Sequence, residues 1–240
     1  LLVDDRGAVW VGHFQAGLDY SLYQNGLFRT YAYLPQFNSA NLSIRSFVNR
    51  GPEKVIGSRD GLFYINEATG IVKSFVKPVL TSDLILTICF YEGEYYIGTY
   101  GGGMMVLNPQ TLSLKYFTQG DTELFQKGHI FCVKPDNRGN LWIGTSQGLF
   151  CYNGQTKQIK NFTSTNSQLP EGNVYEVSFD STGKGWIATE TGMCIYDPAS
   201  QSLRSNVFPE GFVHKDKVRT IYEDAEHNLY FIREKGSLFT

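Results

Sequence analysis

The sequence lacks a strong charge of either sign: 21 Lys and Arg residues stand against 23 Asp and Glu residues, a formal net charge of −2. Without a basic excess the chain has little with which to neutralise phosphates, so nucleic-acid binding is not expected. Long hydrophobic runs are also missing. The longest nearly apolar stretch, Leu84 to Phe90, is too short to span a bilayer, and we expect no membrane contact by this segment.

Cysteines are few and follow no pattern. Cys89, Cys132, Cys151 and Cys194 form no CxxC pair, and each lies in an apolar, strand-like run. The simplest interpretation is four buried free thiols that act as small hydrophobic side chains, with a disulfide as the alternative. No His lies at ligand spacing from any of them, so neither a metal site nor a cofactor is predicted.

The chain does contain many glycines, many aromatic residues and an internal repeat. Its 240 residues include 25 Gly, 17 Phe, 15 Tyr and 3 Trp, a composition typical of short strands joined by tight turns. The clearest repeat, DNRGNLWIGTSQGL at 136–149, recurs as DSTGKGWIATETGM at 180–193. The other copies begin at residues 4, 54, 95 and 224 and read DDRGAVWVG, KVIGSRDGL, YYIGTYGGGM and DAEHNLYFI.

The six copies are spaced by 45, 41, 46, 44 and 44 residues. In the fourth copy, strands are predicted over 130–134, 141–145, 149–153 and 158–163, and apolar residues never follow a helical period for long. Four antiparallel strands in each repeat of roughly 40–50 residues are typical of a propeller blade. We therefore predict an all-β fold, a β-propeller built of four-stranded antiparallel blades.

The repeats divide a single propeller domain, 1–240, into six copies, at approximately 1–37, 38–78, 79–121, 122–166, 167–210 and 211–240. The first copy begins inside a first strand and the last ends before a fourth strand. We therefore expect about five and a half blades, an arc of a larger, seven-bladed propeller.

The repeated residue types have structural explanations. The aromatic residue of each second strand is expected to fill the wedge between neighbouring blades; these residues are Trp10, Tyr96, Trp142, Trp186 and Tyr230. The Gly or Ala two residues later permits close approach of the adjacent backbone. A second set of glycines is expected to meet the backbone geometry of the turn before the third strand. These residues are Gly61, Gly148, Gly192 and Gly236.

The motif DxxGxLWIGTxxGL, as at 136–149, resembles the two-component regulator propeller repeat. This resemblance implies the periplasmic sensor region of a hybrid two-component system sensor histidine kinase of Bacteroidetes, an inner-membrane protein. It further implies a glycan breakdown product as the ligand. The partners that it implies are a neighbouring propeller or an immunoglobulin-like domain of the same chain, and a homodimer is a further expectation.

Catalytic motifs are weak. Gly144 to Gly148 matches G-x-S-x-G, but it is one copy of a repeated hairpin turn rather than a nucleophile elbow. The histidines are scattered singly, so we expect no catalysis in this segment. One alternative is a propeller enzyme, such as a polysaccharide or antibiotic lyase, with His13 and His214 near Arg45. A second alternative is a purely structural protein-interaction propeller.

The candidate binding residues lie where propeller loops emerge around the central channel. At the start of each innermost strand one position varies while its neighbours stay apolar, and strand alternation is expected to turn it toward the channel entrance. These positions are Arg45, Leu86, Phe131, Tyr175 and Arg219. Tyr100 and Arg59 are the candidates in the neighbouring loops. Two Arg and two aromatic residues suit an acidic or planar-faced sugar, the alternative being that they fill the channel mouth or contact the next domain.

Overall fold

The computed structural model describes the backbone of residues 2–3, 9–13, 17–21, 28–30, 43–120, 122–205, 217–224, 226–233 and 238–239. It describes side chains from residue 43 onward within these ranges, apart from residues 122, 238 and 239.

Every described sheet consists of consecutive strands paired antiparallel. The first sheet is β1 (Leu2–Val3), β2 (Val9–His13), β3 (Gly17–Ser21) and β4 (Phe28–Thr30), and the second is β5 (Ile44–Arg50), β6 (Glu53–Ser58), β7 (Gly61–Asn66) and β8 (Ile71–Phe75). The third is β9 (Ile85–Tyr91), β10 (Glu94–Thr99), β11 (Met104–Leu107) and β12 (Leu114–Tyr116). The fourth is β13 (Ile130–Pro135), β14 (Asn140–Thr145), β15 (Gly148–Asn153) and β16 (Ile159–Phe162). The fifth is β17 (Val174–Phe179), β18 (Gly185–Thr189), β19 (Gly192–Asp197) and β20 (Ser202–Arg204), and the sixth is β21 (Val218–Glu223), β22 (Leu229–Arg233) and β23 (Leu238–Phe239).

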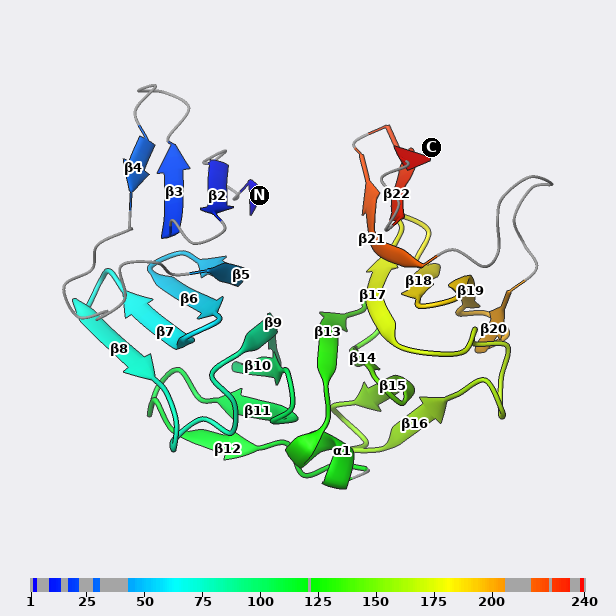
Figure 1. The fold of residues 1–240 in the computed structure, drawn as a ribbon, viewed down its shortest axis with the longest axis horizontal. Coiled ribbons are helices and arrows are strands. Elements are labelled where there is room, and N and C mark those ends of the chain that lie inside the picture. The colour runs from blue at the N-terminus through cyan, green and yellow to red at the C-terminus, as the bar shows by residue number, and fades with distance from the viewer. Residues whose placement is uncertain are drawn as a thin grey trace.

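The sheets stand side by side along an arc, with β5, β9, β13 and β17 at its inner edge and β8, β12, β16 and β20 at its outer edge (Figure 1). The first and last sheets lie at the two ends of the arc. The predicted all-β propeller of four-stranded antiparallel blades is therefore confirmed. The blade number of the complete ring and the domain limits stay predictions.

The helix α1 (Thr122–Lys127), between β12 and β13, was not predicted from the sequence. Its six residues are too few to show a helical period. In the described parts of the chain, no helix has the length and apolar character needed to cross a bilayer.

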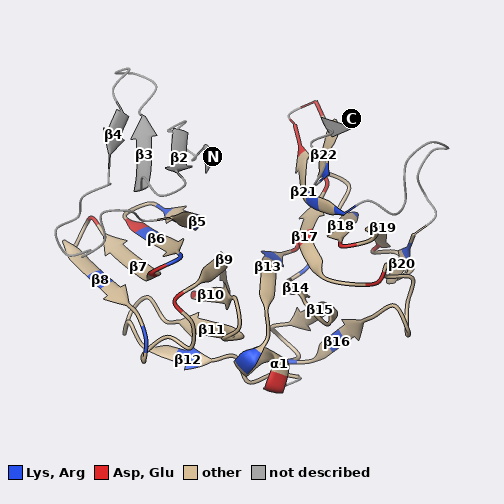
Figure 2. Ribbon diagram, in the orientation of Figure 1, with Lys and Arg blue, Asp and Glu red and all other residues tan. Residues whose placement is uncertain are grey.

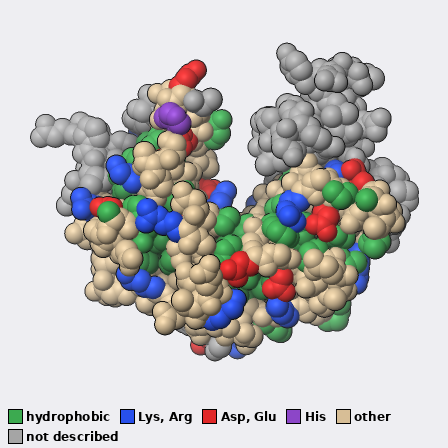
Figure 3. Space-filling view, turned by 180° about the vertical axis from the view of Figure 1, so that it is seen from behind, with side chains coloured by type: hydrophobic (Ala, Val, Ile, Leu, Met, Phe, Trp, Pro, Cys, Tyr) green, Lys and Arg blue, Asp and Glu red, His purple; other side chains and the backbone are tan. Residues whose placement is uncertain are grey.

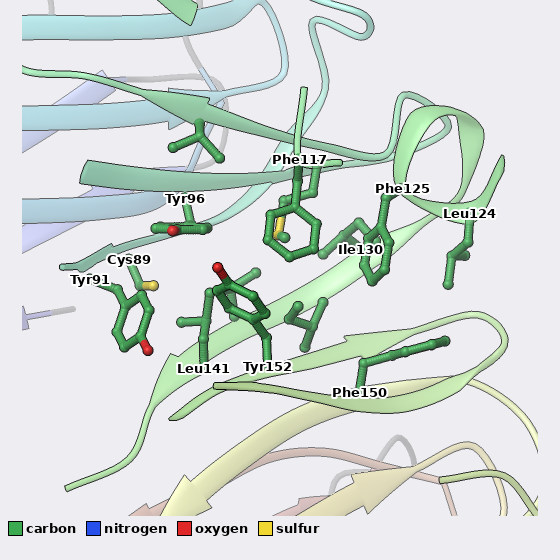
Figure 4. Packing of buried hydrophobic residues seen from close by; sticks show 14 residues of the cluster. Cys89, Tyr91, Tyr96, Phe117, Leu124, Phe125, Ile130, Leu141, Phe150 and Tyr152 are labelled. Carbon is green, nitrogen blue, oxygen red and sulfur yellow. The ribbon is translucent and has the colours of Figure 1, made fainter. Parts of the chain in front are cut away.

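The wedges between blades are filled by the predicted aromatic residues. Tyr96 lies in a buried cluster that joins the third sheet, α1 and the fourth sheet, with its ring centroid 6.1 Å from that of Phe117 (Figure 4). Trp142 is 1% exposed and lies 4.5 Å from Tyr196 of the fifth sheet, measured between ring centroids. The ring centroid of Trp186 lies 5.8 Å from that of Phe231 of the sixth sheet. The wedge prediction is thus confirmed at these three positions.

The two ends of this series differ. The side chain of Trp10 lies outside the described residues. Tyr230 is half-buried and its ring lies 6.3 Å from Tyr222 of its own sheet.

An Asp at the first turn of a blade connects that turn to the wedge. Asp136 Oδ1 accepts hydrogen bonds from the backbone N–H groups of Arg138 and Asn140, at 2.8 and 2.9 Å. Asp136 Oδ2 accepts another from Trp142 Nε1, at 2.9 Å. One carboxylate therefore fixes both the tight turn and the orientation of the buried indole, which explains the spacing of Asp and Trp in the repeat.

Two glycines of the fourth copy sit where a side chain does not fit. A Cβ on Gly144 would lie 2.8 Å from the carbonyl oxygen of Val174 in the next blade, so the absence of a side chain lets the inner strands pack. Gly148 has φ +122° and a Cβ there would lie 2.5 Å from the carbonyl oxygen of Phe162. Gly236, at the corresponding position of the sixth copy, lies outside the described residues.

All four cysteines are free thiols, as predicted. Cys89, Cys132 and Cys194 are buried, and Cys151 is half-buried. Burial raises the pKa of the Cys89 and Cys151 thiols to about 12 each. The thiols therefore stay protonated at neutral pH, which makes them poor nucleophiles.

Candidate functional site

The varying positions of the inner strands are β-bulge residues. In each sheet from the second to the sixth, the register between the inner strand and its neighbour skips one residue. The skipped residues are Arg45, Leu86, Phe131, Tyr175 and Arg219. A bulge leaves one residue unpaired and re-aims its side chain, so the backbone itself turns these five side chains out of the ladder.

A repeated backbone hydrogen bond fixes the surroundings of each bulge. The N–H of the residue after the second strand donates to the carbonyl of the residue before the inner strand. These bonds run from Arg59 to Ser43, Tyr100 to Leu84, Ser146 to His129 and Glu190 to Asn173, at 3.0, 2.9, 3.2 and 2.9 Å.

We call the surface built from these positions the bulge face. It consists of Ser43, Arg45, Arg59, Leu84, Leu86, Tyr100, His129, Phe131, Ser146, Asn173, Tyr175, Glu190, Lys217 and Arg219. Lys217 precedes the inner strand β21 as His129 precedes β13.

A row of ring contacts crosses four blades on the bulge face. Tyr100 stacks on His129, with ring centroids 4.0 Å apart, and Phe131 meets Tyr175 edge-on at 5.1 Å. The ring centroids of His129 and Phe131 lie 6.2 Å apart, and this contact connects the two pairs. At the far end, the guanidinium carbon of Arg219 lies 4.5 Å from the centroid of the Tyr175 ring. The row therefore joins an exposed aromatic residue to an exposed cation.

Glu190 holds Tyr175 by its hydroxyl group. The Tyr175 hydroxyl donates to the Glu190 carboxylate, and Asn173 Nδ2 donates to Glu190 Oε2 at 2.7 Å. Lys217 Nζ lies 3.2 Å from Glu190 Oε1. The hydrogen bond from Tyr175, followed by the contact with Lys217, lowers the pKa of Glu190, which is therefore ionised at neutral pH.

The structure thus brings together four of the six predicted site residues. Tyr100, which is 50% exposed, and Phe131, Tyr175 and Arg219 form one row. Arg45 and Arg59 are exposed on the second sheet, and neither makes a hydrogen bond, ion pair or ring contact with the described part of the row.

Part of the site was not predicted from the sequence, and other predicted residues remain untested. Four residues of the bulge face were not among the predicted site residues: His129, Asn173, Glu190 and Lys217. Three of them, His129, Asn173 and Lys217, directly precede an inner strand, and this shared position in the repeat is a signal that could have identified them. The pair proposed for the lyase alternative falls outside the description, because the His13 side chain and all of His214 are not described.

A hollow lies at the other end of the inner strands. It has a volume of about 970 Å³ and is lined mainly by residues of β5, β9 and β13. The guanidinium carbon of Arg50 lies 3.3 Å from the centroid of the Phe90 ring. Its cations have acidic neighbours: Arg50 faces Glu53 and Lys134 faces Glu176, each pair at 3.5 Å. We regard the bulge face as the better candidate, since a row of aromatic rings from three blades and an exposed Arg lie together there.

Charges elsewhere are dispersed. Basic and acidic residues are scattered along the arc (Figure 2), and the face seen from behind shows both signs interspersed (Figure 3). Among the residues whose positions are described, no group of three or more His, Cys, Asp or Glu is arranged to hold a metal ion.

The fold and the bulge face define a class: a β-propeller with a candidate ligand-binding surface at the inner edge of its blades. The family model described as "Two component regulator propeller" matches residues 125–147, which confirms the predicted resemblance. None of the curated proteins matches the chain.

Two solved structures from B. thetaiotaomicron are similar. The extracellular domain of the hybrid two-component system BT3049 has a TM-score of 0.75 and 25% identity, over 98% of this chain and 32% of that one. The extracellular domain of the hybrid two-component system BT4673 has a TM-score of 0.70 and 18% identity, over 99% of this chain and 37% of that one, and at this identity it shows the fold alone. The chain therefore spans about a third of the length of these similar structures.

Proposed function

We propose that this chain is a propeller segment of the periplasmic sensor of a hybrid two-component system. It binds a glycan breakdown product at the bulge face, carries no catalysis of its own, and passes the signal through a neighbouring domain of the same chain. The similarity to extracellular domains of such systems supports the sensor role and the location outside the cytoplasm.

One observation carries the choice of site: the row from Tyr100 to Arg219, which residues of four blades build on the bulge face. A pyranose ring has an apolar face of C–H groups that packs on aromatic side chains, while its hydroxyl groups need polar partners. The row offers aromatic rings beside Asn173, Glu190 and Lys217. A ligand that bridges several blades would also couple them, which is what a sensor needs.

Calorimetric titration of the complete extracellular region with plant and host oligosaccharides tests the proposal. We expect one oligosaccharide to bind, and Phe131→Ala to weaken its binding about tenfold or more, equivalent to about 1.4 kcal/mol. Tyr222→Ala is the control, since Tyr222 is 63% exposed and lies outside the bulge face.

Two results would contradict the proposal. One is the absence of binding across the whole panel. The other is the appearance of unsaturated products from a polyuronate, measured by absorbance, which would assign the lyase instead.

A further inference from the structure

The bulge face differs in charge from the whole chain. Among its described positions four are basic, namely Arg45, Arg59, Lys217 and Arg219, and one, Glu190, is acidic. The chain as a whole has slightly more acidic than basic residues. A basic surplus at one site of an otherwise acidic chain attracts anions.

Tyr175 is a support for Arg219 rather than an open platform. The Arg219 guanidinium lies over the Tyr175 ring, Lys217 Nζ lies 5.0 Å from the centroid of the same ring, and Glu190 holds the hydroxyl group. A guanidinium stacked on an aromatic ring keeps its N–H donors in its own plane, around its rim. Arg219 is also exposed.

The remaining rings of the row lie on one side of this cation. Phe131 meets Tyr175 at 5.1 Å, and the stacked pair of His129 and Tyr100 follows. An anionic group bound by Arg219 therefore has aromatic surface next to it, in the direction of Tyr100.

We propose that the ligand of the bulge face is an anionic oligosaccharide. Its carboxylate or sulfate group is bound by Arg219, and its sugar rings pack against Phe131 and Tyr100. Both anions present the paired oxygens that match the guanidinium fork. This assignment rests on the proposed glycan-binding function and adds the class of glycan to it.

The test uses the complete extracellular region and probes of matched length: a neutral oligosaccharide, a uronic-acid oligosaccharide, a sulfated oligosaccharide and inorganic sulfate. We expect one of the two acidic oligosaccharides to bind, and which of them binds identifies the anionic group. Arg219→Gln should weaken that binding about tenfold or more, and Arg219→Lys should recover part of it, because Lys keeps the charge without the fork.

Arg204→Gln is the matched control, an exposed arginine on the outer strand β20, and it should leave binding unchanged. Thermal unfolding of each variant checks that the fold is retained. Binding should also weaken with added salt, as expected for an exposed ion pair.

Three results overturn the assignment. Neutral oligosaccharides that bind as tightly as acidic ones, with no effect of Arg219→Gln, reject the anionic class while the glycan-binding function stands. Binding of inorganic sulfate without any oligosaccharide rejects the sugar part. If none of the probes binds, the proposed function itself is rejected.

Discussion

The two ends of each blade repeat different things. At the first turn the residues themselves recur: Asp136 and Asp180 bind the indoles of Trp142 and Trp186, at 2.9 and 2.8 Å. At the other end a Ser or Thr closes the second strand and its hydroxyl donates to a backbone carbonyl of the following turn, at Ser58, Thr99, Thr145 and Thr189. At the bulge positions themselves only the backbone recurs, and the five side chains share no property.

The difference follows from what each end must do. Where a blade has the turn Asp and the wedge aromatic residue, they meet the same requirement, because each pair must close a hairpin and fill the same kind of gap. A bulge sets the direction of a side chain whatever its chemistry is. We infer that the first turn and its wedge residue maintain the fold and that the bulge positions are available for function.

The largest expected effect is at the turn end. Trp142→Ala should lower the free energy of unfolding by about 3–5 kcal/mol, since it empties a fully buried wedge. Urea unfolding followed by circular dichroism measures this loss, with the exposed Tyr222→Ala as the control. A loss below about 1 kcal/mol would mean that the wedge is not a main source of stability.

Gly148→Ala should cost about 1–3 kcal/mol, because a side chain there strains the backbone and meets the Phe162 carbonyl. Gly70→Ala measures the cost of a milder positive φ without any contact. Gly70 also has a positive φ, +71°, but a Cβ there has nothing within 4 Å. If both variants lose the same stability in thermal unfolding, the contact with Phe162 does not matter.

Asp180→Asn should cost about 1 kcal/mol at neutral pH by weakening hydrogen bonds to the turn and to Trp186. Burial raises the pKa of Asp180, but the hydrogen bonds from Thr182 and Trp186 outweigh it, so the pKa is lowered overall. A lowered pKa stabilises the fold above the unfolded value, about 3.9, and this contribution is lost as pH falls through the folded pKa.

Unfolding measured between pH 7 and pH 3 checks this expectation. The loss of stability with falling pH should be smaller in Asp180→Asn than in the unsubstituted protein. Equal slopes would show that Asp180 does not contribute.

The smallest effect is expected at the bulge end. Arg45→Leu should change stability by no more than about 0.5 kcal/mol, since Arg45 is exposed and Leu occupies the same position in the third sheet, at Leu86. Thermal unfolding measures it. A loss comparable to that of Trp142→Ala would remove the distinction between the two ends.

Much of the fold was predictable because its signals are local. The predicted strand over 141–145 is β14 (Asn140–Thr145), and the wedge roles of Tyr96, Trp142 and Trp186 follow from the repeat. The bulges were not predictable. They depend on the register between strands, which the apolar pattern of one strand does not contain.

The site was predictable only in part. The positions of Phe131, Tyr175 and Arg219 follow from their equivalent places in three repeats. Their contacts could not be predicted, because they join side chains from different blades. The same holds for Glu190, which contacts Tyr175 and Lys217 only because of the way its turn and the next blade are placed.

The sequence by itself determined the blade. Its turns, its strands and its wedge residue lie within one repeat, where short-range hydrogen bonds and side-chain periodicity act. The tertiary structure alone decided which side chains meet at the inner edge. The partners in the row, such as Tyr100 with His129 and Phe131 with Tyr175, come from different blades, and only the packing of one sheet against the next brings them into contact.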